Sequence, residues 1–187
     1  MADATSPLGG ASPIGGPELV VAEVPHLAKV TVRGREAVPA LVQAVTAALG
    51  IAPPLTANTT TRLADRTVLW LAPGEWRVVG PPGDEAALVE ALRAEVPRRL
   101  AGVVDVSDFY TTIRLGGGAA RAVLAQGCPL DLHPRAFRAG SCAQSLLADT
   151  DVLLHQTDDA PTYEIQVRWS QAAHVWAWLA DAARNLA

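Results

Sequence analysis

Residues 127–147 read GCPLDLHPRAFRAGSCAQSLL and contain both cysteines of the chain, together with Asp131 and His133. Cysteine, histidine and aspartate close together are residue types that metal and catalytic sites use. The glycines and prolines between them are typical of turns. We therefore interpret this segment as a turn-rich connector that leaves a helix and enters a strand.

Apolar residues on both sides of the connector follow strand and helix periods. Strands are predicted at residues 20–24, 27–33, 67–71, 75–79, 103–106, 110–115, 141–148, 152–156 and 163–168, and residues 55–63 are either a strand or a loop. Helices are predicted at residues 36–49, 85–100, 119–125 and 170–184, the first ended by Gly50 and the second capped by Asp84. The order strand-strand-helix-strand-strand-helix occurs twice, with a period of about 80 residues. This order predicts an α+β fold with two pseudo-repeated halves.

The composition sets the domain organisation and excludes some partners. Residues 1–17 are rich in Ala, Ser, Pro and Gly and are predicted to be a disordered tail, followed by a first half at 18–101 and a second half at 102–187. The net charge is −4 and no run of basic residues occurs, which argues against nucleic acid and against an anionic membrane surface. No apolar run reaches the ~20 residues of a membrane helix, and the N-terminus does not resemble a secretory signal. We expect a cytoplasmic protein with free thiols.

Zinc is the first alternative for the connector. Cys128, His133 and Cys142 could be ligands, with His155 as a fourth. Structural zinc sites usually have ligand pairs spaced two to four residues apart, and the chain has no such pair. Buried thiols and a turn histidine are the favoured interpretation.

Two further segments could carry chemistry. The triplet Gly116-Gly117-Gly118 precedes a predicted helix but lacks the lysine and spacing of phosphate-binding loops, so a tight turn is expected. Asp105 and Asp108 flank Ser107, a composition that forms turns through ordinary hydrogen bonds. The four histidines do not stand in a catalytic spacing, and we expect no active site in this chain.

The last predicted helix has one apolar stripe, formed by Ala172, Val175, Trp176, Leu179, Ala182, Ala183 and Leu186. Trp178 lies about 200° around the helix from Trp176, because each residue turns the chain by about 100°. Trp169 stands where the preceding strand meets the helix. An exposed tryptophan favours a protein interface, whereas the alternative is that Trp178 packs on the other half of the chain.

Residues 20–185 resemble the gamma subunit of bacterial heterotetrameric sarcosine oxidase. The resemblance is carried by Asp105-Val106-Ser107, Gly127-Cys128-Pro129-Leu130-Asp131-Leu132, Phe137, Gly140, Cys142-Ala143-Gln144 and the segment from Val167-Arg168 to Trp178-Leu179, with Trp70-Leu71 and Glu75-Trp76 in the first half. The chain departs from the family at Asp108-Phe109-Tyr110 and Ser170-Gln171-Ala172, which are expected contact positions.

The resemblance implies a fold similar to the folate-binding T-protein and a role in one-carbon metabolism. Members of the family work in a complex that oxidises sarcosine to glycine, with formation of hydrogen peroxide and methylenetetrahydrofolate. The resemblance implies that FAD, FMN, NAD, zinc and tetrahydrofolate belong to partner subunits and that this chain carries no cofactor. Its partners would be the alpha, beta and delta subunits, chiefly alpha.

Our first hypothesis is therefore a non-catalytic assembly subunit of sarcosine oxidase. The predicted partner contacts are Trp178, Trp169, Leu130, Asp131, His133 and Phe137. Trp178→Ala is expected to weaken assembly by about 2 kcal/mol while the isolated fold stays intact. The alternative is a stand-alone folate-binding or one-carbon-transfer module, with Asp105 or Asp108 holding the pterin ring.

Overall fold

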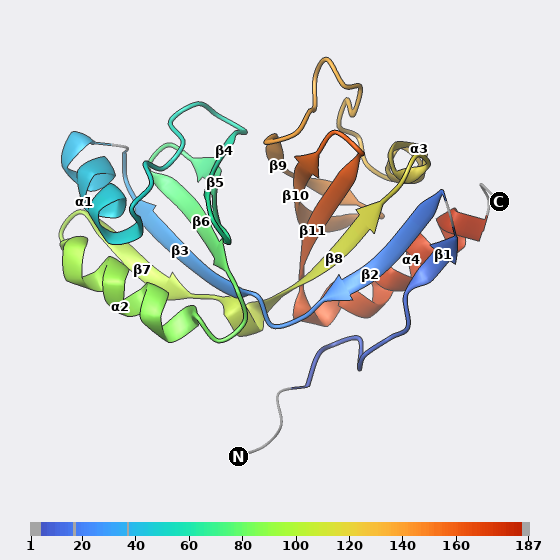
Figure 1. The fold of residues 1–187 in the computed structure, drawn as a ribbon, viewed down its shortest axis with the longest axis horizontal. Helices are drawn as coiled ribbons and strands as arrows, with labels where there is room; N and C mark the ends of the chain where they lie inside the picture. The colour runs from blue at the N-terminus through green and yellow to red at the C-terminus, as the bar shows by residue number, and fades with distance from the viewer. Residues whose placement is uncertain (1–4, 17, 37, 185–187) are drawn as a thin grey trace. The chain divides into compact units, whose positions relative to one another are not determined.

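The computed structural model describes residues 5–16, 18–36 and 38–184, which form two compact units. The central unit is His26–Asp108. The terminal unit combines the segments before and after it, Met1–Pro25 and Phe109–Ala187 (Figure 1). Within the described residues, no helix combines the length and apolarity that a membrane span needs.

The central unit is an antiparallel sheet of five strands with two helices on one face (Figure 1). Its strand order is β4-β5-β6-β3-β7, formed by β3 (Ala28–Gly34), β4 (Thr60–Leu63), β5 (Arg66–Ala72), β6 (Glu75–Gly80) and β7 (Ala101–Asp105). The helices are α1 (Pro39–Leu49) and α2 (Glu85–Glu95). Trp76 is fully buried in their shared core, and its indole nitrogen donates to the carbonyl of Pro54 at 2.8 Å.

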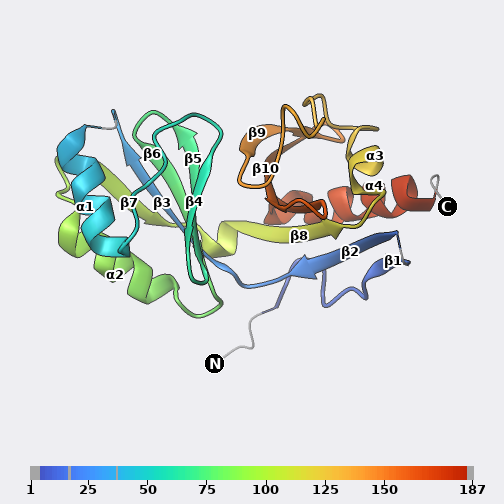
Figure 2. The same ribbon diagram turned by 45° about the horizontal axis from the view of Figure 1, so that its top comes forward.

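The terminal unit is an antiparallel sheet of six strands, in the order β1-β2-β8-β11-β10-β9. The strands are β1 (Ile14–Gly16), β2 (Leu19–Val24), β8 (Tyr110–Gly116), β9 (Cys142–Leu147), β10 (Thr150–Asp158) and β11 (Thr162–Arg168). Helix α4 (Ala172–Arg184) lies along one face of this sheet (Figure 2), and the short helix α3 (Ala120–Leu124) contributes to the same core. Ile113, Ile165 and Val175 are fully buried there.

The predicted α+β class is confirmed, and nearly all predicted strands and helices form within a few residues of their expected bounds. The segment 55–63 is a loop that becomes strand β4 at Thr60. Helix α2 ends at Glu95, because Val96 precedes a proline and adopts an extended conformation. Asp84 is the N-cap residue of α2, as predicted, but its side chain makes no capping hydrogen bond. Its carboxylate instead accepts a hydrogen bond from Arg66 at 2.7 Å.

The division of the chain differs from the predicted halves at 18–101 and 102–187. Strand β2 pairs with β8 and so belongs with the second half, whereas β7 pairs with β3 and belongs with the first. Within the stretch predicted to be a tail, β1 pairs with β2, while residues 1–4 and 17 lie outside the described residues. Pairing between strands distant in sequence leaves no mark in a local apolar pattern, so the sequence predicts other boundaries than the structure has.

Candidate functional site

The connector between α3 and β9 is built from turns that use its own polar side chains. The Asp131 carboxylate accepts from the backbone N–H of His133 at 2.9 Å, and Nδ1 of His133 accepts from the backbone N–H of Arg135 at 3.2 Å. The carbonyl of His133 accepts from two further backbone N–H groups. The prediction of a turn-rich connector is thus confirmed, and the histidine serves a turn.

The apolar residues of the connector belong largely to the core. Both cysteines are buried thiols, as predicted. Phe137 is 5% exposed and stacks on Tyr163 with ring centroids 6.4 Å apart, and Leu130 packs partly buried against the same core. Burial raises the pKa of Tyr163, against the opposing charge of Arg121. Of the predicted contact residues in the connector, only Asp131 and His133 are exposed side chains.

The helical angle alone suggested that Trp178 is exposed on the surface of α4, and the structure shows otherwise. Trp178 is half-buried and packs on the core of the terminal unit. Its indole covers Gly127, where a Cβ atom would lie only 2.5 Å from Cζ2 of the tryptophan. Gly127 is therefore required by close approach, and the contact lies within one unit rather than against the other half. Of the predicted apolar stripe, Ala172, Val175, Leu179 and Ala182 are buried, while Leu186 lies outside the described residues.

An exposed aromatic cluster lies where β8 begins and β11 ends. Phe109 is 53% exposed and meets the ring of Tyr110 edge-on at 5.0 Å. The guanidinium of Arg168 lies over the Phe109 ring, 5.7 Å from its centroid. Trp169 follows Arg168 directly and is 37% exposed. Aromatic and arginine side chains are the types enriched at protein interfaces. Phe109 is not one of the six named partner contacts, but it lies in the segment 108–110, which departs from the family pattern and is an expected contact position.

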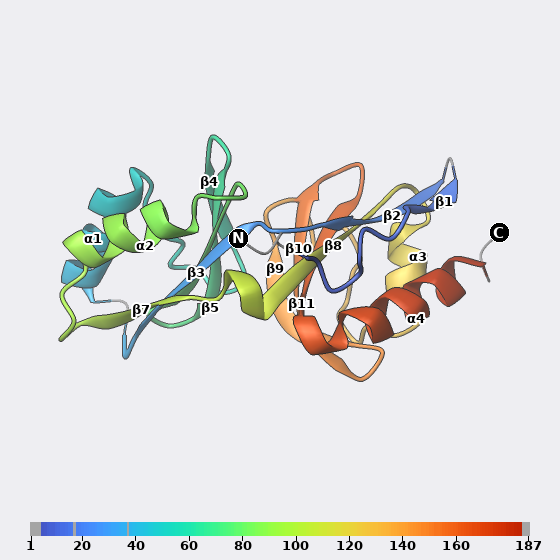
Figure 3. The ribbon, with the colours of Figure 1, turned by 90° about the horizontal axis from the view of Figure 1, so that it is seen from below.

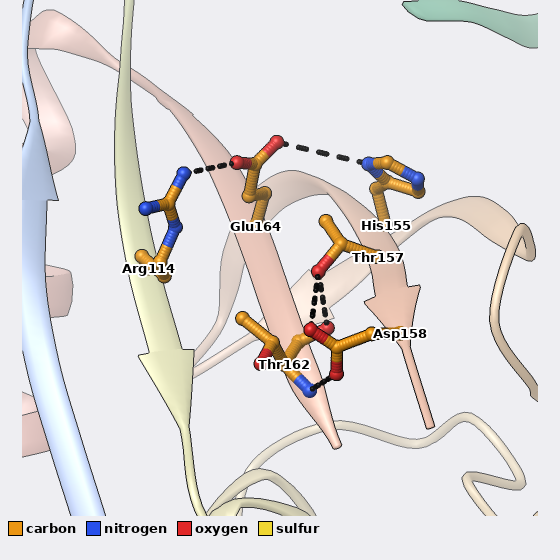
Figure 4. A network of polar contacts seen from close by, with 6 residues as sticks. All are labelled: Arg114, His155, Thr157, Asp158, Thr162 and Glu164. Carbon is orange, nitrogen blue, oxygen red and sulfur yellow. Dashed lines mark hydrogen bonds and ion pairs between the residues drawn. The ribbon is translucent and has the colours of Figure 1, made fainter. Parts of the chain in front are cut away.

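A row of three ionisable side chains, the charged row, crosses the terminal unit's sheet (Figure 4), and the sequence did not predict it. The register aligns Arg114 of β8, Glu164 of β11 and His155 of β10. The Glu164 carboxylate accepts from Arg114 at 2.8 Å and lies 3.7 Å from Nδ1 of His155. Burial alone would raise the pKa of Glu164, but the hydrogen bonds and positive charges of His155 and Arg114 outweigh it and lower the pKa to about 2.

Strands β10 and β11 are joined by a turn that the Asp158 carboxylate stabilises (Figure 4). The carboxylate accepts from the backbone N–H groups of Ala160 and Thr162, at 3.0 and 2.9 Å. Burial raises the pKa of Asp158, but the hydrogen bonds from Thr162, Ala160 and Thr157 together outweigh it and lower the pKa below the ordinary value. This carboxylate is a turn-former in an exposed hairpin.

The two other polar segments also have structural explanations. Ser107 donates its N–H and its hydroxyl to Asp105 at 2.9 and 2.7 Å, and its oxygen accepts from the backbone N–H of Lys29. Gly117 has φ +113°, and a Cβ there would lie 2.3 Å from the carbonyl oxygen of Glu18. Both match the predicted turns. In the part of the chain that the structure describes, no three His, Cys, Asp or Glu side chains cluster in a way that could hold a metal ion.

Comparison with known proteins identifies the family. The family model described as "Sarcosine oxidase, gamma subunit family" matches residues 33–185. The chain belongs to the sarcosine oxidase gamma subunit family. The resemblance carried by the connector and the last helix is thereby confirmed.

Individual relatives agree with this assignment. The chain is 37% identical over 147 residues to sarcosine oxidase subunit gamma of Arthrobacter sp, covering 77% of this chain and 70% of that protein. It is 40% identical over 122 residues to the corresponding protein of Corynebacterium sp. (strain P-1), covering 64% of this chain and 58% of that one. The aligned part thus spans somewhat over half the length of the Corynebacterium relative.

Solved structures share the fold. A chain of heterotetrameric sarcosine oxidase from Corynebacterium sp. U-96 matches with a TM-score of 0.88 and 27% identity, over 97% of this chain and 95% of that chain. The glycine cleavage system aminomethyltransferase T from Bartonella henselae matches with a TM-score of 0.68, over 96% of this chain and 53% of that chain. At 18% identity, the second likeness shows the fold alone.

Proposed function

We propose that this chain is a non-catalytic assembly subunit of a heterotetrameric sarcosine oxidase. The observation that carries the proposal is the match to a chain of such a complex along almost the whole length of both chains. In this proposal the complex oxidises sarcosine to glycine with formation of hydrogen peroxide and methylenetetrahydrofolate. The alpha, beta and delta subunits are the partners, and they hold the flavins, NAD, zinc and tetrahydrofolate.

The aromatic cluster supports an assembly role. Phe109 and Trp169 expose large apolar side chains beside the cation of Arg168. Aromatic anchors next to an arginine often contribute most of the free energy of a protein interface. We place the principal contact with the alpha subunit here, with Asp131 and His133 of the connector as further contacts.

Affinity purification of the tagged chain, co-expressed with its oxidase partners, tests the proposal. The expected result is co-purification of large flavin-bearing chains and a yellow eluate with a flavin absorption spectrum. A lone, colourless chain would contradict the subunit function, and binding of tetrahydrofolate to that lone chain would favour a folate module.

Substitutions then test the contact surface separately. Trp169→Ala is expected to weaken assembly by about 2 kcal/mol, or roughly 30-fold. Leu55→Ala is the matched control, because Leu55 is a 62% exposed apolar side chain of the central unit. Equal assembly of both variants would move the contact away from the aromatic cluster while leaving the subunit function in place.

A further inference from the structure

The edge of the central unit's sheet at β7 is open and is bordered by a hollow. Among the residues that the structure describes, only β3 pairs with β7, which ends the strand order of this sheet (Figure 3). A hollow of about 490 Å³ lies beside it, lined by Arg93, Val96, Arg98, Ala101, Gly102 and Val103. The hollow lies between the C-terminal end of α2 and this edge, so it borders backbone as well as side chains.

The backbone of β7 directs alternate residues to the open side. Val106 donates its N–H to the carbonyl of Lys29 in β3. In an antiparallel pair the bonding direction alternates, so Val104 also bonds toward β3 and Val103 presents its N–H and carbonyl at the edge. The carbonyl of Val103 accepts from Nη2 of Arg93 at 3.2 Å. The N–H of Val103 therefore remains directed toward the hollow.

The charged side chains that line the hollow are both positive, although exposed Asp105 ends β7 and exposed Glu95 ends α2. Arg93 and Arg98 are the charged residues that line the hollow, and both are exposed. Arg99 follows and is exposed too. The whole chain has a net charge of −4, so this positive group differs from the average character of the protein. Positive surfaces select partners that present carboxylates.

We propose that β7 binds an extended, acidic segment of a partner polypeptide as an additional strand. The N–H of Val103 would donate to a backbone carbonyl of the segment, and glutamate or aspartate side chains would accept from Arg93 and Arg98. Arg93 can do so while bound to Val103, because a guanidinium has five N–H donors. Addition of a strand at an open sheet edge is a recurrent way in which proteins bind peptides. This inference is independent of the proposed oxidase complex.

A protective arrangement is the competing explanation. Sheet edges often carry charged side chains that prevent pairing with other chains. If Arg93 and Arg98 only protect the edge, an acidic strand would gain nothing there. The two explanations differ in whether peptides bind, and in which peptides do so.

Fluorescence anisotropy on the purified full chain tests the proposal. The probe is a labelled decapeptide of alternating Glu and Val, and the comparison is its counterpart of alternating Lys and Val. We expect the acidic peptide to bind, more weakly as salt rises, and the basic peptide not to bind. Arg98→Glu should weaken the acidic peptide roughly tenfold, because it replaces an attraction by a repulsion. Arg135→Glu is the matched control, an exposed arginine of the other unit, and should leave binding unchanged.

A second variant tests the backbone component. Val103→Pro removes the outward N–H without touching the bonds to β3, and should reduce binding to a similar extent. When the acidic decapeptide is added to the parent chain, the backbone amides of β7 should exchange their hydrogens more slowly. Equal binding of acidic and basic peptides, unchanged binding by Arg98→Glu, or no added protection of β7 would each overturn the proposal. The exchange measurement and Arg98→Glu decide the question even if Val103→Pro fails to fold.

Discussion

Glu164→Gln replaces the central carboxylate of the charged row by a neutral group of the same shape. The Glu164 side chain is 16% exposed and its pKa is lowered from 4.5 to about 2. A decrease of that size corresponds to about 3 kcal/mol of folding free energy at neutral pH. Because the Arg114 side chain is 49% exposed and its charge is screened, we expect a loss of about 2 kcal/mol in Glu164→Gln.

The sign of the pH dependence follows from the lowered pKa. Between the pKa of Glu164 in the unfolded chain, 4.5, and its pKa in the folded chain, about 2, the unfolded chain binds the proton and the folded chain does not. Unfolding is therefore favoured as the pH falls through this range. The contribution of Glu164 is complete above its ordinary pKa of 4.5 and is lost as the pH falls toward about 2. The difference between parent and Glu164→Gln should therefore be large at pH 7 and small at pH 2.

Urea unfolding followed by circular dichroism at both pH values measures this difference. Hydrogen exchange of a peptide covering β10 and β11 localises the change to the charged row. Asp181→Asn is the matched control, because Asp181 pairs with Arg184 at 2.7 Å on the surface of α4 with both side chains mostly exposed. That substitution should cost less than about 0.5 kcal/mol.

Two results would refute this reasoning. Equal unfolding free energies of parent and Glu164→Gln at pH 7 would mean that burial of the carboxylate cancels its attraction to Arg114 and His155. A difference that persists unchanged at pH 2 would mean that packing, and not the charge, is responsible.

Three other substitutions test the packing. Gly127→Ala should destabilise the chain by about 1–3 kcal/mol in thermal unfolding, because the new Cβ atom would clash with Trp178. Adding Trp178→Leu should recover part of this loss. Gly102→Ala is the control and should be about as stable as the parent, because a Cβ there meets no atom within 4 Å. Phe137→Ala should lower the free energy of unfolding in urea by about 3–5 kcal/mol, because the ring is buried. Stability equal to the parent would contradict this core role and favour the predicted partner contact instead. Trp76→Phe should cost about 1–3 kcal/mol because a buried carbonyl loses its donor, and an unchanged melting temperature would contradict that hydrogen bond.

Local patterns in the sequence predicted the α+β class and most of the regular elements. Strand alternation and helical spacing record which side of each element meets the core, and that record is local. The turns at Asp105-Val106-Ser107 and in the connector could also be predicted from the sequence. Asp and Ser side chains form hydrogen bonds with backbone groups a few residues away, and Gly adopts turn conformations. The residues of the connector and the last helix were sufficient to recognise the family.

How these elements combine depends on contacts that form only in the folded chain. The assignment of β2 to the terminal unit, the row from Arg114 through Glu164 to His155, and the open edge of β7 all depend on which strands pair. Trp178 faces away from the apolar stripe of its helix and is nevertheless half-buried, because Gly127 allows the connector to pass beneath its ring. Strand pairing and such close contacts join residues distant along the chain, whereas a local pattern shows only that a side chain has an apolar neighbour.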